Sequence, residues 1–132
     1  MNEGAATVVI DVPRGSFIKR NDDGTVDFVS PLPSPFNYGH VPDTVAEDGD
    51  ACDAVVLGPR LTRGTERRVA IRGRVGFLDA GLADPKWICA DSPLTVADRQ
   101  RVEAFFRRYA AAKRLINRLR GKRGDTRYLG WL

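Results

Sequence analysis

Residues 47–59 read EDGDACDAVVLGP and join a cluster of acids to a short apolar run. Asp48, Asp50 and Asp53 fall within six positions, immediately before Ala, Val, Val and Leu. An acidic surface turn that leads into a buried strand would produce this pattern. A metal site would also produce it, because carboxylate oxygens are the ligands that hard cations such as Mg²⁺ and Mn²⁺ prefer.

Two familiar metal sites do not fit the acidic stretch. An EF-hand that begins at Asp48 would need glycine at its sixth position and glutamate at its twelfth, where the chain has Asp53 and Pro59. Zinc is disfavoured because the chain has a single histidine and its two cysteines lie far apart. The remaining metal interpretation is a cation held by aspartates alone.

A second acidic segment strengthens the metal interpretation. Residues 78–86 read LDAGLADPK and contain Asp79, Asp84 and Lys86. Loops at one end of a small barrel lie close together, and carboxylates that converge there cannot all stay ionised without cations between them. A centre with several metal ions would remove that repulsion and would bind a polyanion.

Length and composition predict one soluble domain over residues 1–132, with 42% apolar residues. No apolar stretch approaches the roughly 20 residues of a membrane span, and the opening residues show no export signal. Two cysteines without a CxxC spacing predict reduced thiols and a cytoplasmic location. The net charge of +4 is concentrated between Arg99 and Arg127, which leaves nucleic-acid binding open.

The apolar pattern predicts short strands followed by one long helix. The predicted strands cover residues 6–13, 15–20, 25–29, 53–59, 67–79 and 86–90, and the proline-rich stretch 30–42 is expected to be an ordered loop. Residues 94–120 repeat apolar side chains every three or four positions, so they predict an amphipathic helix with Thr95 as its N-cap. The sum is an α+β chain, mainly β, compatible with a small closed barrel.

Several motifs together resemble the soluble family I inorganic pyrophosphatases. The run VVIDVPRGS (8–16) is similar to the family's opening strand, and NYGHVPDTVAEDGDACDAVVLGP (37–59) resembles its central signature with Asp-Gly-Asp-x-x-Asp. DAGLADPK (79–86) resembles its second motif, and FFRRY (105–109) and the final GW (130–131) fit as well. The resemblance implies a five-stranded closed barrel of the OB type, with the long C-terminal amphipathic helix packed outside.

The same resemblance implies an activity and a set of site residues. The family hydrolyses pyrophosphate to two phosphates with several Mg²⁺ ions, by metal-activated water. Mn²⁺ is the alternative ion that aspartate ligands would accept. By this resemblance Asp50 is the general base. The implied metal ligands are Asp48, Asp53, Asp79 and Asp84. The implied phosphate-binding groups are Lys19, Tyr38, Lys86 and Tyr109.

The sequence also departs from the family pattern. Asp11 and Asn21 stand where the family has glutamates, and Phe28, Ser34 and Ala110 stand where it has an arginine, a tyrosine and a lysine. Donors for the leaving phosphate are therefore depleted, whereas the metal side is nearly complete. Lys113 lies four residues after Tyr109, on the same helix face, and is a candidate replacement.

Three functions compete at this point. The first is an Mg²⁺-dependent pyrophosphatase, weakened in its phosphate donors. The second is a hydrolase of the same fold that cleaves another phosphoanhydride or a phosphate ester. The third, ranked last, is a non-catalytic relative that binds nucleic acid or protein through its basic helix, and it gives no reason to retain Asp50. The expected partner is a small phosphate substrate, no membrane is expected, and a homo-oligomer stays open.

Overall fold

The computed structural model describes residues 4–16, 18–20, 26–29 and 33–132. These residues form nine strands and one helix. The strands are β1 (Ala5–Val12), β2 (Ile18–Arg20), β3 (Val26–Val29), β4 (Asn37–Val41), β5 (Cys52–Val56), β6 (Glu66–Asp79), β7 (Leu82–Ala83), β8 (Lys86–Cys89) and β9 (Arg127–Trp131), and the helix is α1 (Val96–Leu119). The predicted class, mainly β with one long helix, is confirmed.

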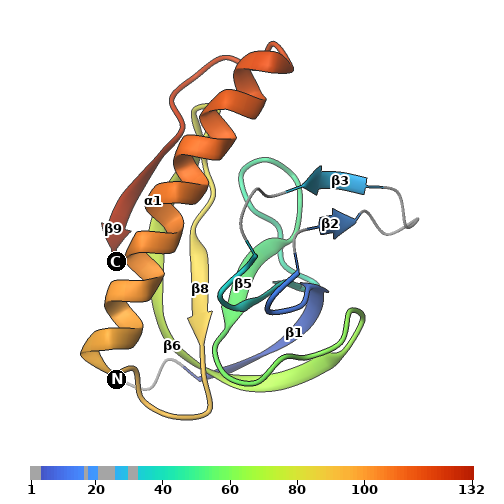
Figure 1. Ribbon diagram of the computed structural model, residues 1–132, viewed down its shortest axis with the longest axis vertical. Helices are drawn as coiled ribbons and strands as arrows, with labels where there is room; N and C mark the ends of the chain where they lie inside the picture. The colour runs from blue at the N-terminus through green and yellow to red at the C-terminus, as the bar shows by residue number, and fades with distance from the viewer. Residues whose placement is uncertain (1–3, 17, 21–25, 30–32) are drawn as a thin grey trace.

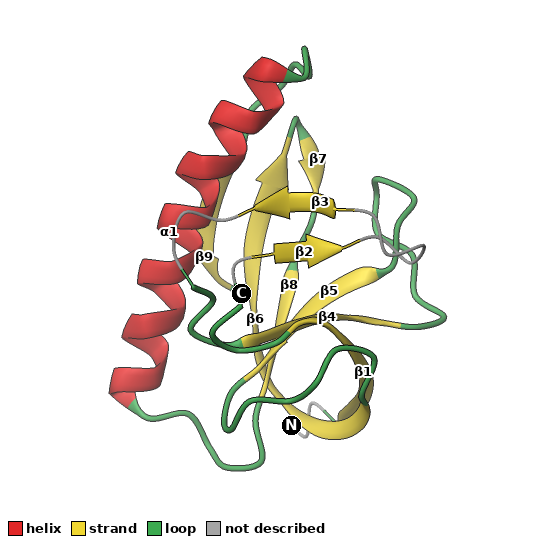
Figure 2. Cartoon of the chain, turned by 45° about the vertical axis from the view of Figure 1, so that its right-hand side comes forward, coloured by secondary structure: helices red, strands yellow, loops and turns green. Residues whose placement is uncertain are grey.

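Five strands form a closed cycle of backbone pairings. β1 pairs with β4, β4 with β5, β5 with β8, β8 with β6, and β6 returns to β1. Only the β5–β8 pair of this cycle is parallel. β7 and β9 extend the sheet from β6, and β2 and β3 form a separate hairpin (Figures 1 and 2). A five-membered cycle is what the predicted barrel requires, but the closed OB-type geometry itself stays a prediction.

The long strand β6 connects most of the sheet. Its first part pairs with β1, its middle with β8, and its last part with β7 and β9. The pairing register shifts between Ile71 and Gly73 and again between Gly76 and Phe77. Such irregularities bend a strand and increase its twist. One continuous segment can therefore serve both the five-strand cycle and the edge that α1 covers.

The prediction that residues 30–42 form a loop is wrong for β4. The prolines that dominate this stretch flank the strand and leave Asn37–Val41 free to pair on both sides, with β1 and β5. Gly39 is essential to this arrangement, because a Cβ there would lie 2.1 Å from the carbonyl oxygen of Val9. The composition signal for a loop thus concealed a strand in the centre of the sheet.

The helix begins as the sequence predicts. Thr95 is the N-cap, its hydroxyl accepts from the backbone N–H of Asp98, and the Asp98 carboxylate accepts from the backbone N–H of Thr95. This reciprocal pair is a capping box. No helix in the described part of the chain is long and apolar enough to cross a membrane.

Apolar side chains form two core clusters. One joins α1 to the sheet through Val102, Phe106 and Ala110, and the other gathers around Val8, Ile10 and Cys89. Figure 1 shows α1 running along one side of the sheet, with β9 beside it and the β2–β3 hairpin on the other side. The side of α1 that packs on the first cluster also carries Asn117, whose Nδ2 donates to Asp79 of the second acidic motif.

Candidate active site

The centre of the candidate site is a lysine with no exposed surface. Lys86 opens β8, is 0% exposed, and donates from Nζ to Oδ2 of Asp53 at 2.6 Å and to Oδ2 of Asp84 at 2.7 Å. Asp53 and Lys86 are direct partners in the parallel β5–β8 pair. The backbone register therefore brings together two motifs that are 33 positions apart in the sequence.

Charges around Lys86 keep it protonated despite its burial. Burial alone would lower the pKa of Lys86, but the negative groups around it, Asp53 first, raise that pKa above its ordinary range. The rings of Phe77, Tyr109 and Tyr38 lie 5.2, 5.5 and 5.7 Å from Nζ and add cation–π attraction. The lysine is thus a fixed positive charge under the two aspartates.

Asp84 is the most buried carboxylate of the cluster, at 6% exposure. Burial raises the pKa of Asp84; the Lys86 ammonium opposes this shift, and the charges of Asp53 and Asp48 add to it. Asp48 is therefore close enough to act on Asp84 electrostatically. Three carboxylates near one ammonium leave an excess of negative charge at this point.

Asp79 lies in a second group at the end of β6. Its Oδ1 accepts from Nδ2 of Asn117 at 2.7 Å, and its Oδ2 lies 3.4 Å from Nζ of Lys113. Burial would raise the pKa of Asp79, but the Asn117 hydrogen bond and the Lys113 charge outweigh it and lower that pKa. Asn117 also donates to Oγ1 of Thr126, which accepts from the backbone N–H of Ala80.

The sequence interpretation missed Asn117. It lies four residues after Lys113 and eight after Tyr109, so helical spacing alone places all three on one face of α1. An asparagine at a buried helix position needs polar partners, and Nδ2 of Asn117, a residue only 4% exposed, donates to both Asp79 and Thr126. The four-residue spacing of Tyr109, Lys113 and Asn117 is the sequence pattern that could have identified Asn117 as a site residue.

Two tyrosines border the lysine. The hydroxyl of Tyr38 on β4 donates to Oδ2 of Asp53 at 3.0 Å, and burial followed by the Asp53 charge raises the pKa of Tyr38 well above its ordinary value. The Tyr109 ring on α1 stacks on the Tyr38 ring with centroids 6.1 Å apart and planes at 20°. The two rings thus join the sheet to the helix directly beside the carboxylates.

The remaining predicted residues are less closely grouped. Asp50 is exposed, and its backbone N–H donates to Oδ1 of Asp48 at 3.0 Å, so both lie in one turn before β5.

Asp11 on β1 lies 2.8 Å from Nδ1 of His40. His40 is a half-buried residue of β4, whereas the sequence predicted a loop there. Lys19 belongs to β2, and its side chain, like that of Phe28, lies outside the described part.

Two of the expected departures have a clear structural position. The Ser34 hydroxyl donates to the backbone carbonyl of Phe36 at 2.6 Å, so it is used within its own turn. Ala110 is buried in the core cluster and lines a pocket between α1 and β9. Asn21 lies outside the described residues.

The donor set fits a hard cation, although the described residues contain no group of three or more acidic, histidine or cysteine side chains placed to hold one. Lys86 Nζ lies between Asp53 and Asp84 and Lys113 lies on Asp79, which separates the acids into two groups. The acids of both groups supply carboxylate oxygens, and the two acidic motifs contain five aspartates, whereas the ion pairs involve only two lysines, Lys86 and Lys113. Oxygen ligands with excess negative charge are what Mg²⁺ requires.

Comparison with known proteins identifies the family. The family model described as "Inorganic pyrophosphatase" matches residues 8–124, most of the chain. The chain belongs to the inorganic pyrophosphatase family. Relatives include the inorganic pyrophosphatase of Aquifex pyrophilus, 32% identical over 77% of this chain and 70% of that protein, and that of Haemophilus influenzae, 28% identical over 99% and 82%. This membership confirms the family that the sequence motifs predict.

Coverage differs among the relatives of this pyrophosphatase-family chain. The soluble inorganic pyrophosphatase of Oryza sativa subsp. indica is 35% identical over 64% of this chain but only 44% of its own length, so the chain spans less than half of that relative. Among solved structures, the Thermus thermophilus inorganic pyrophosphatase superposes with a TM-score of 0.77 at 27% identity, and the Neisseria gonorrhoeae enzyme with 0.74 at 26%. Each match covers 82% of the solved chain and at least 97% of this one.

Proposed function

We propose that the chain is an inorganic diphosphatase, which hydrolyses pyrophosphate to two phosphates. Family membership supports this reaction, and the observation that carries it is the Asp53–Lys86–Asp84 cluster, which joins the two acidic motifs at one point. Phosphoryl transfer asks little covalent chemistry of the protein; it needs an aligned nucleophile and compensation of charge on the phosphate oxygens. An acidic cluster that holds divalent cations would meet both demands, because the cations would compensate the phosphate charge and position a water molecule.

Asp48, Asp53, Asp79 and Asp84 are the proposed ligands of several Mg²⁺ ions, for which Mn²⁺ is an alternative. When bound, these ions would neutralise the carboxylates, hold the anionic substrate and make water a better nucleophile. Asp50 would accept the proton from the attacking water at a carboxylate oxygen, while a new P–O bond forms and the bridging P–O bond breaks. Its exposed position in a turn fixed by the Asp48 side chain supports access to such a water.

The basic and phenolic groups would bind the substrate. Lys86 contributes a permanent charge beneath the ligands, and Tyr109 and Tyr38 border the same point. Lys113 is proposed to replace the family's lysine at position 110, because it reaches Asp79 from the next turn of α1. Lys19 and Asp11 complete the proposed set on the hairpin side, Lys19 for phosphate and Asp11 for a cation.

Phosphate release from pyrophosphate tests the proposal. With Mg²⁺ present, Asp50→Asn should lower turnover by about 10²–10⁴-fold, the usual contribution of a general base. Asp43→Asn is the matched control, since it removes the same charge from the same acidic loop, and asparagine tolerates the φ of 64° found there. Equal turnover in Asp50→Asn and wild type would exclude Asp50 as the base.

A second candidate reaction is favoured by the donor positions. Ser34 is engaged with its own backbone and Ala110 faces the core, so neither would contact a leaving phosphate. A leaving group with less charge than phosphate would need fewer donors, as in another phosphoanhydride or a phosphate ester. Turnover of such substrates at rates above that of pyrophosphate, and abolished in Asp50→Asn, would replace the first proposal.

The remaining parts of the proposal concern the chain as a whole. We infer that residues 1–132 act as a single domain in the cytoplasm, and the two free cysteines agree with a reducing compartment. Cell fractionation tests the location; recovery of the protein outside the cytoplasm would contradict it.

A further inference from the structure

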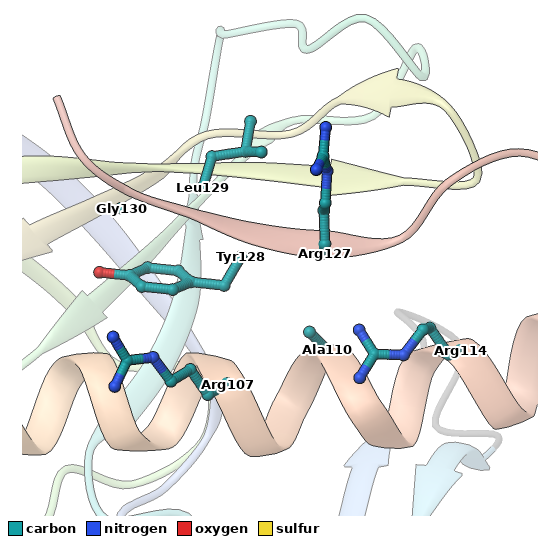
Figure 3. A pocket seen from close by; sticks show the side chains of 7 residues that line it. All are labelled: Arg107, Ala110, Arg114, Arg127, Tyr128, Leu129 and Gly130. Carbon is teal, nitrogen blue, oxygen red and sulfur yellow. The ribbon is translucent and has the colours of Figure 1, made fainter.

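A pocket of about 360 Å³ lies between α1 and β9, and none of its lining residues is among the candidate active-site residues. Its lining consists of Arg107, Ala110 and Arg114 from α1, and Arg127, Tyr128, Leu129 and Gly130 from β9. Figure 3 shows the Arg107 and Arg114 side chains in the gap between the two elements, with Ala110 between them on the helix. Arg127 leaves β9 away from the helix in this view.

The helix spacing sets the distance between the two central arginines. Residues seven apart lie on nearly the same face of a helix and are separated by about 10.5 Å along its axis. Ala110, between them, contributes only a methyl group to the wall of the pocket. Tyr109 and Lys113 point from another side of α1 towards Asp53, Asp84 and Asp79, so the pocket and the carboxylate groups do not share side chains.

Each arginine is oriented by the protein but keeps N–H groups for a ligand. Arg114 donates one guanidinium N–H to the backbone carbonyl of Thr126 at 3.1 Å. The Arg107 guanidinium lies 5.9 Å from the centroid of the Tyr128 ring. Among the described residues neither forms a salt bridge, whereas Arg127 pairs with Asp125 at 2.8 Å. A guanidinium has five N–H donors, so one backbone bond leaves most of them available.

The charges around the pocket favour an anion. None of the seven lining residues is acidic. Residues 99–127 contain eleven lysines and arginines and only two acidic residues, Glu103 and Asp125. Oriented arginines without carboxylate partners are typical of sites that bind phosphate groups, because the planar guanidinium matches the oxygens in pairs.

The aromatic surroundings favour a phosphate anion over a nucleic acid. The Tyr128 ring already stacks on Phe106 with centroids 6.4 Å apart and planes at 11°, and Arg107 packs against the same ring. Proteins that bind single strands use exposed aromatic rings as platforms for the bases. The Tyr128 ring is therefore packed against other side chains rather than available to stack on a base. The guanidinium groups are the groups of the groove that can bind a ligand.

We propose that Arg107 and Arg114 form a second anion site, in the groove between α1 and β9, that binds inorganic phosphate or pyrophosphate separately from the carboxylate groups. Arg127 is not counted as part of this site, because its guanidinium pairs with Asp125. The site requires no divalent cation, because its donors are already positive. It is thereby distinguished from the proposed active site, where the carboxylates would repel an anion in the absence of metal.

Calorimetric titration of phosphate and of pyrophosphate into the full chain, in EDTA and at fixed ionic strength, tests the proposal. We expect one saturable site per chain. Arg107→Gln and Arg114→Gln should each weaken it at least about tenfold, the effect of losing one charge-assisted contact. Arg68→Gln is the matched control, since Arg68 is an exposed arginine on the β1–β6 pair. The metal-free assay does not depend on turnover, so its failure leaves the proposed function untouched.

A second measurement keeps the proposal testable where a variant fails to fold. In the wild-type chain, arginine side-chain Nε–Hε resonances assigned to Arg107 and Arg114 should shift on titration with pyrophosphate, while that of Arg68 should not. The proposal is wrong if no saturable binding occurs, or if all three arginine variants bind equally. It is also wrong if a single-stranded oligonucleotide binds the groove with a steep salt dependence while pyrophosphate does not.

Discussion

Asp53 and Lys86 face each other across a parallel strand pair, and their side chains meet at 2.6 Å with no solvent on the lysine. Because Asp84 lies 2.7 Å from the same nitrogen, one buried ammonium holds two carboxylates that would otherwise repel each other. Lys86 thus stabilises the fold as well as the candidate site. Replacing it should lower the free energy of unfolding, whatever its effect on a reaction.

Lys86→Met tests that dependence. The methionine retains most of the side-chain volume but leaves Asp53 and Asp84 uncompensated, so we expect a loss of about 3–5 kcal/mol in the free energy of unfolding. Urea unfolding in EDTA measures it, with Lys122→Met, an exposed lysine beyond the helix, as control. Added Mg²⁺ should recover more stability in Lys86→Met than in wild type, since a cation can then compensate the two acids. A variant as stable as wild type in EDTA would show that the cluster does not depend on its lysine.

Lys113 offers a test of the substrate side. Its ammonium lies 3.4 Å from Asp79 and should contact the phosphate in the proposed reaction. Lys113→Gln should lower kcat/KM for pyrophosphate at least about tenfold, because one charge-assisted contact is lost. Arg118→Gln, which removes an exposed positive charge from the last turn of the same helix, should leave kcat/KM near wild type. Equal losses in the two variants would indicate a general effect of helix charge.

Local sequence patterns predicted the structural features that depend on interactions between residues close together in the chain. The N-cap at Thr95 depends on residues three apart, and the Asp48–Asp50 turn on residues two apart. β4 was missed because prolines dominate its surroundings, while the pairing that makes it a strand comes from β1 and β5.

The assembly of the site could not be derived from spacing. The contact between Asp53 and Lys86 follows from the register of β5 and β8, which no short window of sequence contains. The contact between Asn117 and Asp79 joins residues 38 positions apart. The groove at Arg107 and Arg114 likewise depends on β9, which pairs with β6 and lines the groove beside α1.

The reactivity of Cys89 can measure how often the second core cluster, beside the candidate site, opens. It is fully buried in the second core cluster, and burial raises the pKa of its thiol to about 12. Since only a thiolate reacts with disulfide reagents, Cys89 should react with one only as fast as the protein opens. In a Cys52→Ser background, labelling at pH 8 should follow the unfolding rate and accelerate with urea. Rapid labelling of the native protein would show that β8 is accessible without unfolding.

The raised thiol pKa also fixes the direction of a pH effect. The folded state favours the neutral thiol of Cys89. The contribution of this thiol to the free energy of unfolding is therefore fully present below the ordinary thiol pKa, and it is lost as the pH rises towards about 12. The free energy of unfolding of wild type should therefore fall more steeply above pH 9 than that of Cys89→Ala. Parallel curves from urea unfolding at several pH values would contradict a buried, protonated thiol.

The capping box at Thr95 and Asp98 should stabilise the helix that carries Lys113 and Asn117. Thr95→Ala removes one acceptor for an orphan backbone N–H, and we expect a loss of about 1 kcal/mol in the free energy of unfolding.

The backbone hydrogen bond from Thr95 lowers the pKa of Asp98. The contribution of the ionised Asp98 to the free energy of unfolding is therefore present above the pKa that Asp98 has in the unfolded chain, and it disappears as the pH falls below that range. Asp98→Asn should accordingly destabilise the protein at neutral pH and match wild type more closely in acid. Ser92→Ala, just before the helix, is the control, because it deletes an exposed side-chain hydroxyl outside the cap. A loss in Ser92→Ala equal to that in Thr95→Ala would show that the capping geometry is not what stabilises α1.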